Sequence, residues 1–477
     1  MGARPLNSIP FIFILLLSGC VGTAQRLSAI DSALTEIQAG RAEQGRAALE
    51  KMCSEGWSGP CALLGKPAES HSPVPIMQGV TSGEQSRFAI LTPGKDKLTY
   101  YVRWEGGLER LTAEYFSSPG SPGGLDQIEA FHLDPKVKYE LLVIGAQAQL
   151  WDKRSFRALD LNKRRARLAI ASCMDDRYTS EQAKIWPQLL RQKPDAILMI
   201  GDNVYVDRGA FTGGAVNPEF IWLRYRQTRS TLAVFRADPL VPVFAVWDDH
   251  DFGKNDGDRT FAYKNESAEV FYTYFPQRKP GPGFERGPGV SSWWTAFGVH
   301  VALLDDRSFR SPDHLDVPDQ THFGPEQEKW LQDHLDASRE PVLVVSGDQF
   351  FGGYHKFESY EGNQPVSFKQ RLEEWKKVKV PLVFVSGDRH LTEILKVPKE
   401  ALGYPTFELT SSAIHAKVYP NAFKKDPSPN QLAGADGVFN YLIMEIMRAD
   451  HGFLQVDAQS FTLGEKQLYQ KTLTVKH

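Results

Sequence analysis

Four short acidic motifs follow apolar runs in this chain, and their residue types could hold metal ions. The motifs are Ala-Ser-Cys-Met-Asp at 171–175, Gly-Asp-Asn-Val-Tyr at 201–205, Trp-Asp-Asp-His-Asp at 247–251 and Gly-Asp-Arg-His at 387–390. Each apolar run indicates a buried strand of an α/β sheet, and such sheets place ligands at the carboxyl ends of their strands. Together the four strand ends predict one metal-dependent active centre.

The motifs contain both hard and soft donors. Two cations could clamp a phosphate group, and one could lower the pKa of a bound water so that hydroxide attacks at ordinary pH. Asp202 is the candidate carboxylate shared by both ions, because it follows a strand and a glycine directly. Asp249 and Asp388 offer the hard oxygen ligands that suit Ca²⁺, Mg²⁺ or Mn²⁺. The softer donors, which suit a transition metal, are Cys173, Tyr205 and His390.

The four cysteines have different expected roles. Leu-Ser-Gly-Cys at 17–20 follows a short apolar run and resembles the lipobox of bacterial lipoproteins, in which Cys20 would be lipidated. The alternative is signal cleavage near residues 23–24, which leaves no anchor. In an exported protein Cys53 and Cys61 are expected to form a disulfide, with two free buried thiols as the alternative. Cys173 is then unpaired, and a metal bond would explain it.

The composition describes an ordinary globular protein with a small net charge. The chain has 477 residues, 42% hydrophobic and 24% charged, with a formal net charge of −3. This length favours about two or three domains. The charge is unpatterned and the aromatic residues do not alternate with Arg and Lys, so neither a nucleic-acid groove nor a polybasic membrane patch is supported.

The sequence pattern changes along the chain and predicts five segments. An export signal is expected at 1–20, a helical hairpin or pair at 21–69, a small antiparallel β-sandwich at 70–152, a charged linker at 153–165 and an α/β catalytic domain at 166–477. Within the last segment the pattern predicts two helices and three closing strands, and two Gly/Pro-rich surface loops that could border the site. These elements are the helices 179–190 and 325–337, the strands 439–447, 452–459 and 467–475, and the loops 281–289 and 426–437.

The order and spacing of the four motifs, with Glu-Leu-Thr-Ser-Ser at 408–412, resemble the alkaline phosphatase D-like (PhoD-like) branch of the calcineurin-type metallophosphoesterases. The resemblance covers roughly residues 70–477. It implies an α/β calcineurin-like sandwich of two sheets flanked by helices. A small all-β domain of immunoglobulin or fibronectin type is expected before it, after a short helical segment.

The resemblance also implies roles for individual residues. One site would hold Fe³⁺ and a second Ca²⁺, with Mn²⁺, Mg²⁺ or Zn²⁺ as alternatives. His250 would face the substrate and either stabilise the phosphoryl oxygens or protonate the leaving group. Asp202 would bridge the metals, and Arg389 could neutralise the phosphate or point into the sheet. The implied ligands are Cys173, Asp202, Tyr205 and His390 for Fe³⁺, and Asp202, Asp249 and Asp388 for Ca²⁺.

Several assignments near the motifs stay open at this point. Asp248 could replace Asp249 as the ligand, and Asp175 could orient a ligand instead of binding the metal itself. Asn255 and its neighbour Asp256 could be ligands or loop-capping residues. Asp348 follows another predicted strand at a position where calcineurin-type enzymes usually carry a histidine ligand, so it is a departure from that pattern.

The leading interpretation is an exported phosphohydrolase, lipid-anchored in the envelope and monomeric, that cleaves phosphomonoesters, phosphodiesters or both. One alternative is a phospholipase-D-like diesterase acting on envelope lipid or polymer. Another is a catalytically idle, metal-stabilised envelope binding lipoprotein. The expected partners are a small or polymeric phosphate ester and the membrane, and no nucleic acid is expected. The loops that border such a site set its specificity, and their composition does not name a substrate.

Overall fold

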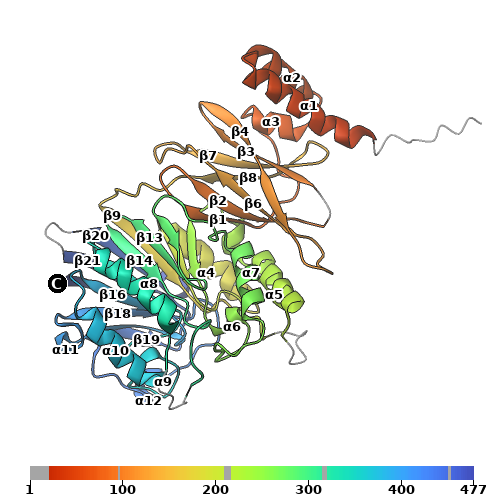
Figure 1. Ribbon diagram of the computed structural model, residues 1–477. Coiled ribbons are helices and arrows are strands. Elements are labelled where there is room, and N and C mark those ends of the chain that lie inside the picture. The colour runs from red at the N-terminus through yellow and green to blue at the C-terminus, as the bar shows by residue number, and fades with distance from the viewer. Residues whose placement is uncertain (1–20, 95–96, 209–215, 314–319, 449–452) are drawn as a thin grey trace, which may run out of the picture. The chain divides into compact units, whose positions relative to one another are not determined.

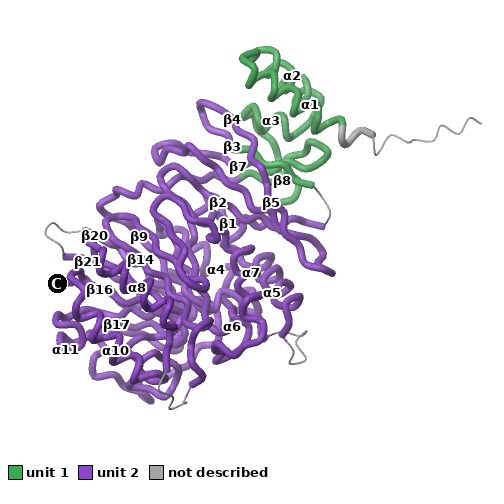
Figure 2. Tube along the Cα trace, in the orientation of Figure 1, with its two compact units in different colours: residues 1–73, 96–101, 142–153 green, residues 74–95, 102–141, 154–477 purple. Residues whose placement is uncertain are grey.

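The computed structural model of this protein describes residues 21–94, 97–208, 216–313, 320–448 and 453–477 (Figure 1). The predicted export signal and Cys20 therefore lie outside the described residues. The chain divides into two compact units (Figure 2). Unit 1 contains the described residues of 1–73, 96–101 and 142–153, and unit 2 contains those of 74–95, 102–141 and 154–477.

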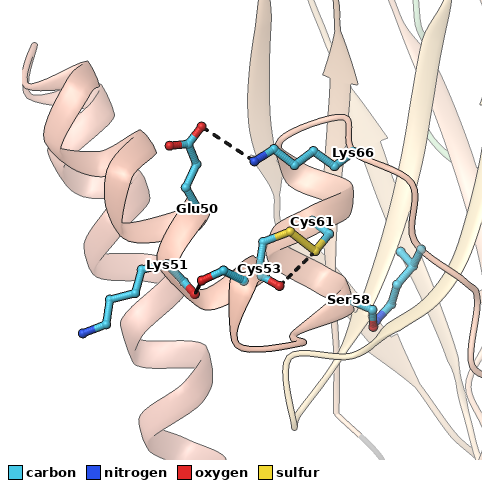
Figure 3. Close-up of a disulfide and its surroundings, with 8 residues drawn as sticks. Glu50, Lys51, Cys53, Ser58, Cys61 and Lys66 are labelled. Carbon is cyan, nitrogen blue, oxygen red and sulfur yellow. Dashed lines mark hydrogen bonds and ion pairs between the residues drawn. A yellow bond between two sulfur atoms is a disulfide. The ribbon is translucent and has the colours of Figure 1, made fainter.

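Unit 1 begins with three helices, where the sequence pattern predicts a helical hairpin or pair. They are α1 (Val21–Gln38), α2 (Ala42–Ser54) and α3 (Ser58–Leu63). Ile30 of α1 and Leu49 of α2 are fully or almost fully buried. A Cβ atom on Gly45 would lie 2.4 Å from the carbonyl oxygen of Ala33, so this glycine allows α1 and α2 to approach closely. A disulfide between Cys53 and Cys61 joins the end of α2 to α3 (Figure 3).

Removing this disulfide is expected to destabilise unit 1. The bridge closes a loop with a sequence separation of 8, so the Cys53→Ser/Cys61→Ser variant should lose about 2–3 kcal/mol through the extra freedom of its unfolded state. Thermal unfolding of the full chain would show the loss as an earlier transition. Dithiothreitol should shift the wild type in the same way and leave the variant unchanged. Identical transitions for both proteins would contradict the prediction.

Short strands follow the helices, and those of the first sheet below pair antiparallel. One four-stranded sheet has the order β1-β2-β6-β5 and another has the order β4-β3-β7-β8. The strands are β1 (Ile76–Thr81), β2 (Ser86–Leu91), β3 (Leu98–Trp104), β4 (Gly107–Leu111), β5 (Ala113–Phe116), β6 (Leu125–Ala130), β7 (Tyr139–Gly145) and β8 (Leu150–Phe156). The predicted immunoglobulin or fibronectin type of this segment and the predicted domain boundaries stay predictions.

Unit 2 also contains a six-stranded sheet of order β11-β10-β9-β20-β21-β22. Its first three strands are parallel to one another, and β20, β21 and β22 continue the sheet in antiparallel pairs. Every residue of β10 and β11 is buried, as their apolar runs predict. The strands are β9 (Arg165–Ala171), β10 (Ala196–Ile200), β11 (Val243–Val246), β20 (Tyr441–Arg448), β21 (Phe453–Phe461) and β22 (Gln467–Lys476).

An eight-stranded sheet of order β12-β13-β14-β15-β16-β18-β17-β19 forms the rest of unit 2. Its central strands β14, β15, β16 and β18 are parallel. The strands are β12 (Phe284–Arg286), β13 (Ser292–Ala296), β14 (Val299–Leu303), β15 (Val342–Val345), β16 (Leu382–Ser386), β17 (Leu391–Val397), β18 (Thr406–Ser411) and β19 (Gln431–Asp436). β12 and β19 lie inside the two stretches that were predicted as loops. These residues form strands because pairing with β13 and β17 overrides their local composition.

The helices of unit 2 are α4 (Thr179–Arg191), α5 (Pro218–Thr231), α6 (Asp249–Phe252), α7 (Lys264–Tyr274), α8 (Gly324–Ala337), α9 (Tyr360–Asn363), α10 (Pro365–Trp375), α11 (Lys399–Leu402) and α12 (Ala422–Lys425). Aromatic contacts hold two of them against the larger sheet. The α8 ring of Trp330 lies 6.5 Å from Trp293 of β13, and Trp375 of α10 lies 5.4 Å from Phe384 of β16. Across the described ranges, no helix is both long enough and apolar enough to pass through a bilayer. The fold is mixed α/β, as predicted.

Candidate metal centre

The four predicted motifs meet where strands of the two large sheets end. Cys173 follows β9, Asp202 follows β10, and Asp388 follows β16 of the other sheet. Hydrogen bonds join the two groups of strand ends. Ser172 Oγ donates to the carbonyl oxygen of Ser411 at 2.9 Å, and Cys173 Sγ lies 2.9 Å from Ser412 Oγ. Motifs more than 200 residues apart in the sequence are therefore brought together.

The soft donors form one buried cluster with Asp202. Ligand atoms of Cys173, Asp202 and His390 all lie within 4.8 Å of one another. The Tyr205 hydroxyl is 3.4 Å from Nε2 of His390, so the phenol oxygen joins the same cluster. Burial raises the pKa of Cys173 well above its usual value, and the nearby carboxylate of Asp202 raises it further. A thiolate at this position consequently needs a cation beside it.

A second buried group shares Asp202 with the first. Ligand atoms of Asp202, Asp249 and His250 lie within 4.8 Å of one another. The backbone N–H of His250 donates to Asp249 Oδ1 at 2.7 Å and to Asp202 Oδ1 at 3.3 Å. Burial raises the pKa of Asp388 to about 7, and the carboxylates of Glu358 and Asp249 contribute to this rise. Asp388 thus lies near enough to Asp249 to interact with it electrostatically, although none of the candidate ligand groups found among the described residues includes it.

Four of the predicted ligands have an unusual backbone conformation. The φ angles of Cys173, Asp202, Asp388 and His390 are 57°, 52°, 55° and 53°. Residues other than glycine rarely adopt this left-handed region, and such strain concentrates at functional sites. The surrounding structure thus holds all four side chains in place at a cost in backbone energy.

The glycines of the Gly-Asp motifs allow the strand ends to pack closely. A Cβ atom on Gly387 would lie 2.8 Å from Ser172 Oγ and 3.0 Å from the carbonyl oxygens of Gly347 and Ile200. These neighbours lie at or just after the ends of β9, β10 and β15. A side chain on Gly387 would push them apart, so this glycine is required for the approach of the two sheets.

Some of the nearby carboxylates pair with buried arginines, and others do not. Arg307 Nε donates to Asp248 Oδ1 at 2.6 Å, and Arg310 Nη1 donates to Asp348 Oδ2 at 3.2 Å. Glu358 forms ion pairs with both arginines, at 3.1 and 2.7 Å. In contrast, within the described ranges no lysine or arginine forms an ion pair with the three predicted hard ligands. These three are Asp202, Asp249 and Asp388.

The arginine pairs bear on the assignments that the sequence left open. Asp248 caps the short helix α6 and pairs with Arg307, whereas Asp249 accepts backbone hydrogen bonds and forms no ion pair with a described lysine or arginine. Asp175 accepts hydrogen bonds from Arg177. The exposed Asp256 differs from these residues, because one of its oxygens lies within 4.8 Å of ligand atoms of Asp249 and Glu358.

The family model of PhoD-like phosphatases matches residues 168–460 of this chain. The chain belongs to the PhoD-like phosphatase family. Alkaline phosphatase D of Bacillus subtilis (strain 168) is 23% identical over 269 residues, which cover 49% of this chain and 44% of that protein. The match thus spans less than half of that relative. A solved structure of PhoD has a TM-score of 0.62 at 15% identity and covers 85% of this chain and 93% of that one. This likeness shows a shared fold.

Two residues that lie beside His250 were not predicted from the sequence of this PhoD-like protein. Asp207 Oδ1 lies 2.7 Å from Nδ1 of His250, and Arg208 Nη2 lies 2.9 Å from Nε2. Burial opposes the charged imidazole, but the carboxylates of Asp249, Asp202 and Asp207 outweigh it and raise the pKa of His250 to about 10. Arg208 can lie this close to Nε2 only while the His250 ring is neutral. When Nε2 is protonated, the Arg208 side chain must turn away. The two residues lie two and three positions after the end of the second motif, and this closeness was the available signal.

Arg307 and Arg310 were missed for a different reason. They follow Asp305 and Asp306 at the end of β14, so besides the four motifs and the strand before Asp348 a sixth apolar run also ends in acidic residues. Asn255, which was a candidate ligand, donates its backbone N–H to Asp207 Oδ2 at 3.0 Å. Nothing in the local pattern distinguishes these structural groups from ligands, because the distinction depends on partners far along the chain.

His415 is a buried structural histidine in this part of the fold. Its Nε2 accepts a hydrogen bond from Trp186 Nε1 at 3.0 Å, and Nδ1 lies 3.1 Å from the carbonyl oxygen of Asp175. This pairing requires the neutral ring, and burial lowers the pKa of His415 to about 4.

Stability should therefore fall in acid through His415. The unfolded chain takes up its proton near pH 6.5, whereas the folded protein does so only near pH 4. Folding free energy is thus lost as the pH falls from about 6.5 to 4, by at most about 3 kcal/mol. His415→Gln keeps an acceptor and a donor without titrating, so its urea midpoint should depend less on pH in this window. Equal slopes for the variant and the wild type would contradict this expectation.

Proposed function

We propose that this protein is a metal-dependent phosphohydrolase that cleaves phosphate monoesters, diesters or both. The observation that carries the proposal is that Asp202 belongs to both buried groups, one with Cys173 and His390 and one with Asp249 and His250. Membership of the PhoD-like phosphatase family and the similarity to an alkaline phosphatase D support it.

The donor set fits a pair of different metal ions. Sulfur, phenol oxygen and imidazole nitrogen would hold Fe³⁺ with Asp202, and carboxylate oxygens of Asp202, Asp249 and Asp388 would hold Ca²⁺. The absence of ion-pairing lysines and arginines around these three carboxylates, within the described residues, supports the fit. Bound there, such ions would polarise a phosphate ester and lower the pKa of water.

The remaining residues of the site would act on the substrate itself. Asp207 fixes the ring of His250 through Nδ1, so Nε2 is the atom that can give a proton to the departing alkoxide. Arg389 is 9% exposed and forms no ion pair with a described carboxylate. Its guanidinium would neutralise charge on the phosphoryl group as the bond to the leaving group breaks.

We propose further that the protein is exported, acts as a monomer and is anchored in the envelope by a lipid on Cys20. The motivation is the charged start, short apolar run and Leu-Ser-Gly-Cys of residues 1–20. Radioactive palmitate should label the wild type and not Cys20→Ser, and the variant should be released from the membrane fraction. Equal labelling of both would exclude the anchor.

The enzymatic proposal is tested with protein that begins at residue 21. It is loaded with iron and Ca²⁺ and assayed on p-nitrophenyl phosphate and on bis(p-nitrophenyl) phosphate. Hydrolysis that disappears with a chelator and returns with metal supports the proposal, and the ratio of the two rates separates a monoesterase from a diesterase. Absence of hydrolysis under all metal conditions would overturn it and favour a metal-stabilised binding protein.

Iron at the soft cluster predicts a visible absorption band. Phenolate and thiolate ligands to Fe³⁺ absorb by charge transfer, so the loaded protein should be coloured. Tyr205→Phe removes the phenol oxygen while the ring remains packed against Cys173, and the band should weaken strongly. Elemental analysis of both proteins serves as the control for iron content. A colourless protein containing only zinc or calcium would contradict the assignment.

A further inference from the structure

Two exposed aromatic rings flank the adjacent residues Arg389 and His390. Phe357 is 50% exposed and Tyr419 is 46% exposed, and both are among the large apolar side chains that the described surface leaves open. The guanidinium carbon of Arg389 lies 4.7 Å from the centre of the Phe357 ring. The ring of His390 stacks on Tyr419 with a centroid distance of 5.5 Å and an interplanar angle of 24°. Both aromatics therefore border the metal centre.

Phe357 is exposed although the loop that carries it is firmly held. His355 Nε2 lies 2.8 Å from Gln349 Oε1, and the backbone N–H of Phe357 donates to His355 Nδ1 at 3.2 Å. On its other side, Glu358 forms ion pairs with the buried Arg307 and Arg310. Exposing half of a phenylalanine costs hydrophobic free energy. The anchored loop therefore fixes the position of this exposed ring beside Arg389.

Lysines place positive charge beside both rings. Lys417 Nζ lies 5.0 Å from the centre of the Tyr419 ring, and Lys356 Nζ lies 5.8 Å from that of Phe357. His390 and Lys417 both lie against Tyr419, so Tyr419 offers its edge and hydroxyl to a ligand. Among the described residues, Arg389, Lys356 and the His355 ring, whose centroid is 6.1 Å away, lie near the Phe357 ring, and its exposed half is available for stacking. Such a pair suits a flat, electron-rich ring close to an anion.

We propose that Phe357 and Tyr419 form the subsite for the alcohol part of the substrate. The substrate class is a phosphate ester whose leaving group carries an aromatic ring. The phosphate would lie at the metal centre near Arg389, and the ring would stack on Phe357 against the edge of Tyr419. The inference rests on the proposed phosphohydrolase function and adds a substrate preference to it.

The test compares two substrates that differ only in the ring. Benzyl phosphate and cyclohexylmethyl phosphate have leaving alcohols of similar basicity and size, and only the first is aromatic. With the metal-loaded full chain, kcat/KM should favour benzyl phosphate by about 3- to 10-fold, the range expected for one aromatic pair. In Phe357→Leu, which retains apolar bulk, the ratio should fall toward one. Phe131→Leu changes another half-exposed phenylalanine and should keep the wild-type ratio and activity.

A binding measurement separates this inference from the enzymatic proposal. Benzylphosphonate and cyclohexylmethylphosphonate resist hydrolysis, and calorimetry should show tighter binding of the aromatic compound to the wild type but not to Phe357→Leu. Turnover of both esters with a ratio near one, or a ratio that Phe357→Leu leaves unchanged, would overturn the subsite and leave the phosphohydrolase standing. If neither ester is hydrolysed, the assays on p-nitrophenyl phosphate and bis(p-nitrophenyl) phosphate still decide the enzymatic proposal, and equal binding of the two phosphonates would overturn the subsite.

Discussion

Asp202→Asn is expected to reduce phosphate ester hydrolysis by about three orders of magnitude, because one carboxylate serves both groups of donors. Asparagine tolerates the left-handed backbone at this position, where φ is 52°, so the fold should be retained. An alanine would combine the loss of the ligand with backbone strain. The measurements are kcat/KM on an aryl phosphate and the content of both metals, which should fall together.

The control for this variant is Asp258→Asn. Asp258 accepts hydrogen bonds from Thr260 in the loop after α6, and an asparagine oxygen can accept the same bonds. Its activity and metal content should match those of the wild type. An Asp202→Asn protein that retains both metals and more than about a tenth of the activity would show that Asp202 does not bridge them.

Arg307→Met is expected to destabilise the protein by about 3–5 kcal/mol. The Arg307 side chain is 0% exposed and lies between Asp248, Asp306 and Glu358. Its loss leaves buried carboxylates without their main counter-charge. Burial already raises the pKa of Asp248 well above its usual value and that of Asp306 to about 6, and loss of the arginine should raise both further. The stability of the variant should therefore fall as the pH rises above about 4, where these carboxyl groups ionise in the unfolded chain. Urea unfolding followed by tryptophan fluorescence would measure both effects.

Arg278→Met is the matched control. Arg278 pairs with Glu269 on the surface, where the two side chains are 35% and 67% exposed, and this pair should contribute less than about 1 kcal/mol. The double variant Arg307→Met/Asp248→Asn should recover part of the loss, because it removes one of the buried charges. If Arg307→Met were as stable as Arg278→Met, the arginine network would have no structural role.

The strand-end motifs could be predicted from the sequence because their signals are local. An apolar run such as Ala196–Ile200 fills a strand that is buried on both faces, and the acidic residue after it lies at the sheet edge whatever the rest of the chain does. The same holds for the helix α4 and for the closing strands β20 to β22. These elements agree with the sequence analysis to within a few residues.

Other features depend on partners that local patterns do not reveal. β19 pairs with β17 although its sequence is typical of a loop, because cross-strand hydrogen bonds outweigh glycine content. Asp248 and Asp249 are adjacent and chemically identical. Arg307, about 60 residues away, pairs with Asp248 and leaves Asp249 without an ion pair among the described residues. The exposure of Phe357 likewise follows from how Glu358 and His355 are held.

The residues of the soft cluster are far apart in the sequence, and this separation determines at what point during synthesis the cluster can form. Cys173 and Ser412, which are in contact, are 239 positions apart, and Tyr205 and His390 are separated by 185. During synthesis, the first half of the chain presents Cys173 and Asp202 without His390 or Asp388. An incomplete donor set binds metal weakly and with little discrimination. If these residues bind metal as proposed, metal selection would be postponed until both sheets have docked, and the finished fold rather than the emerging chain would decide which ion is captured.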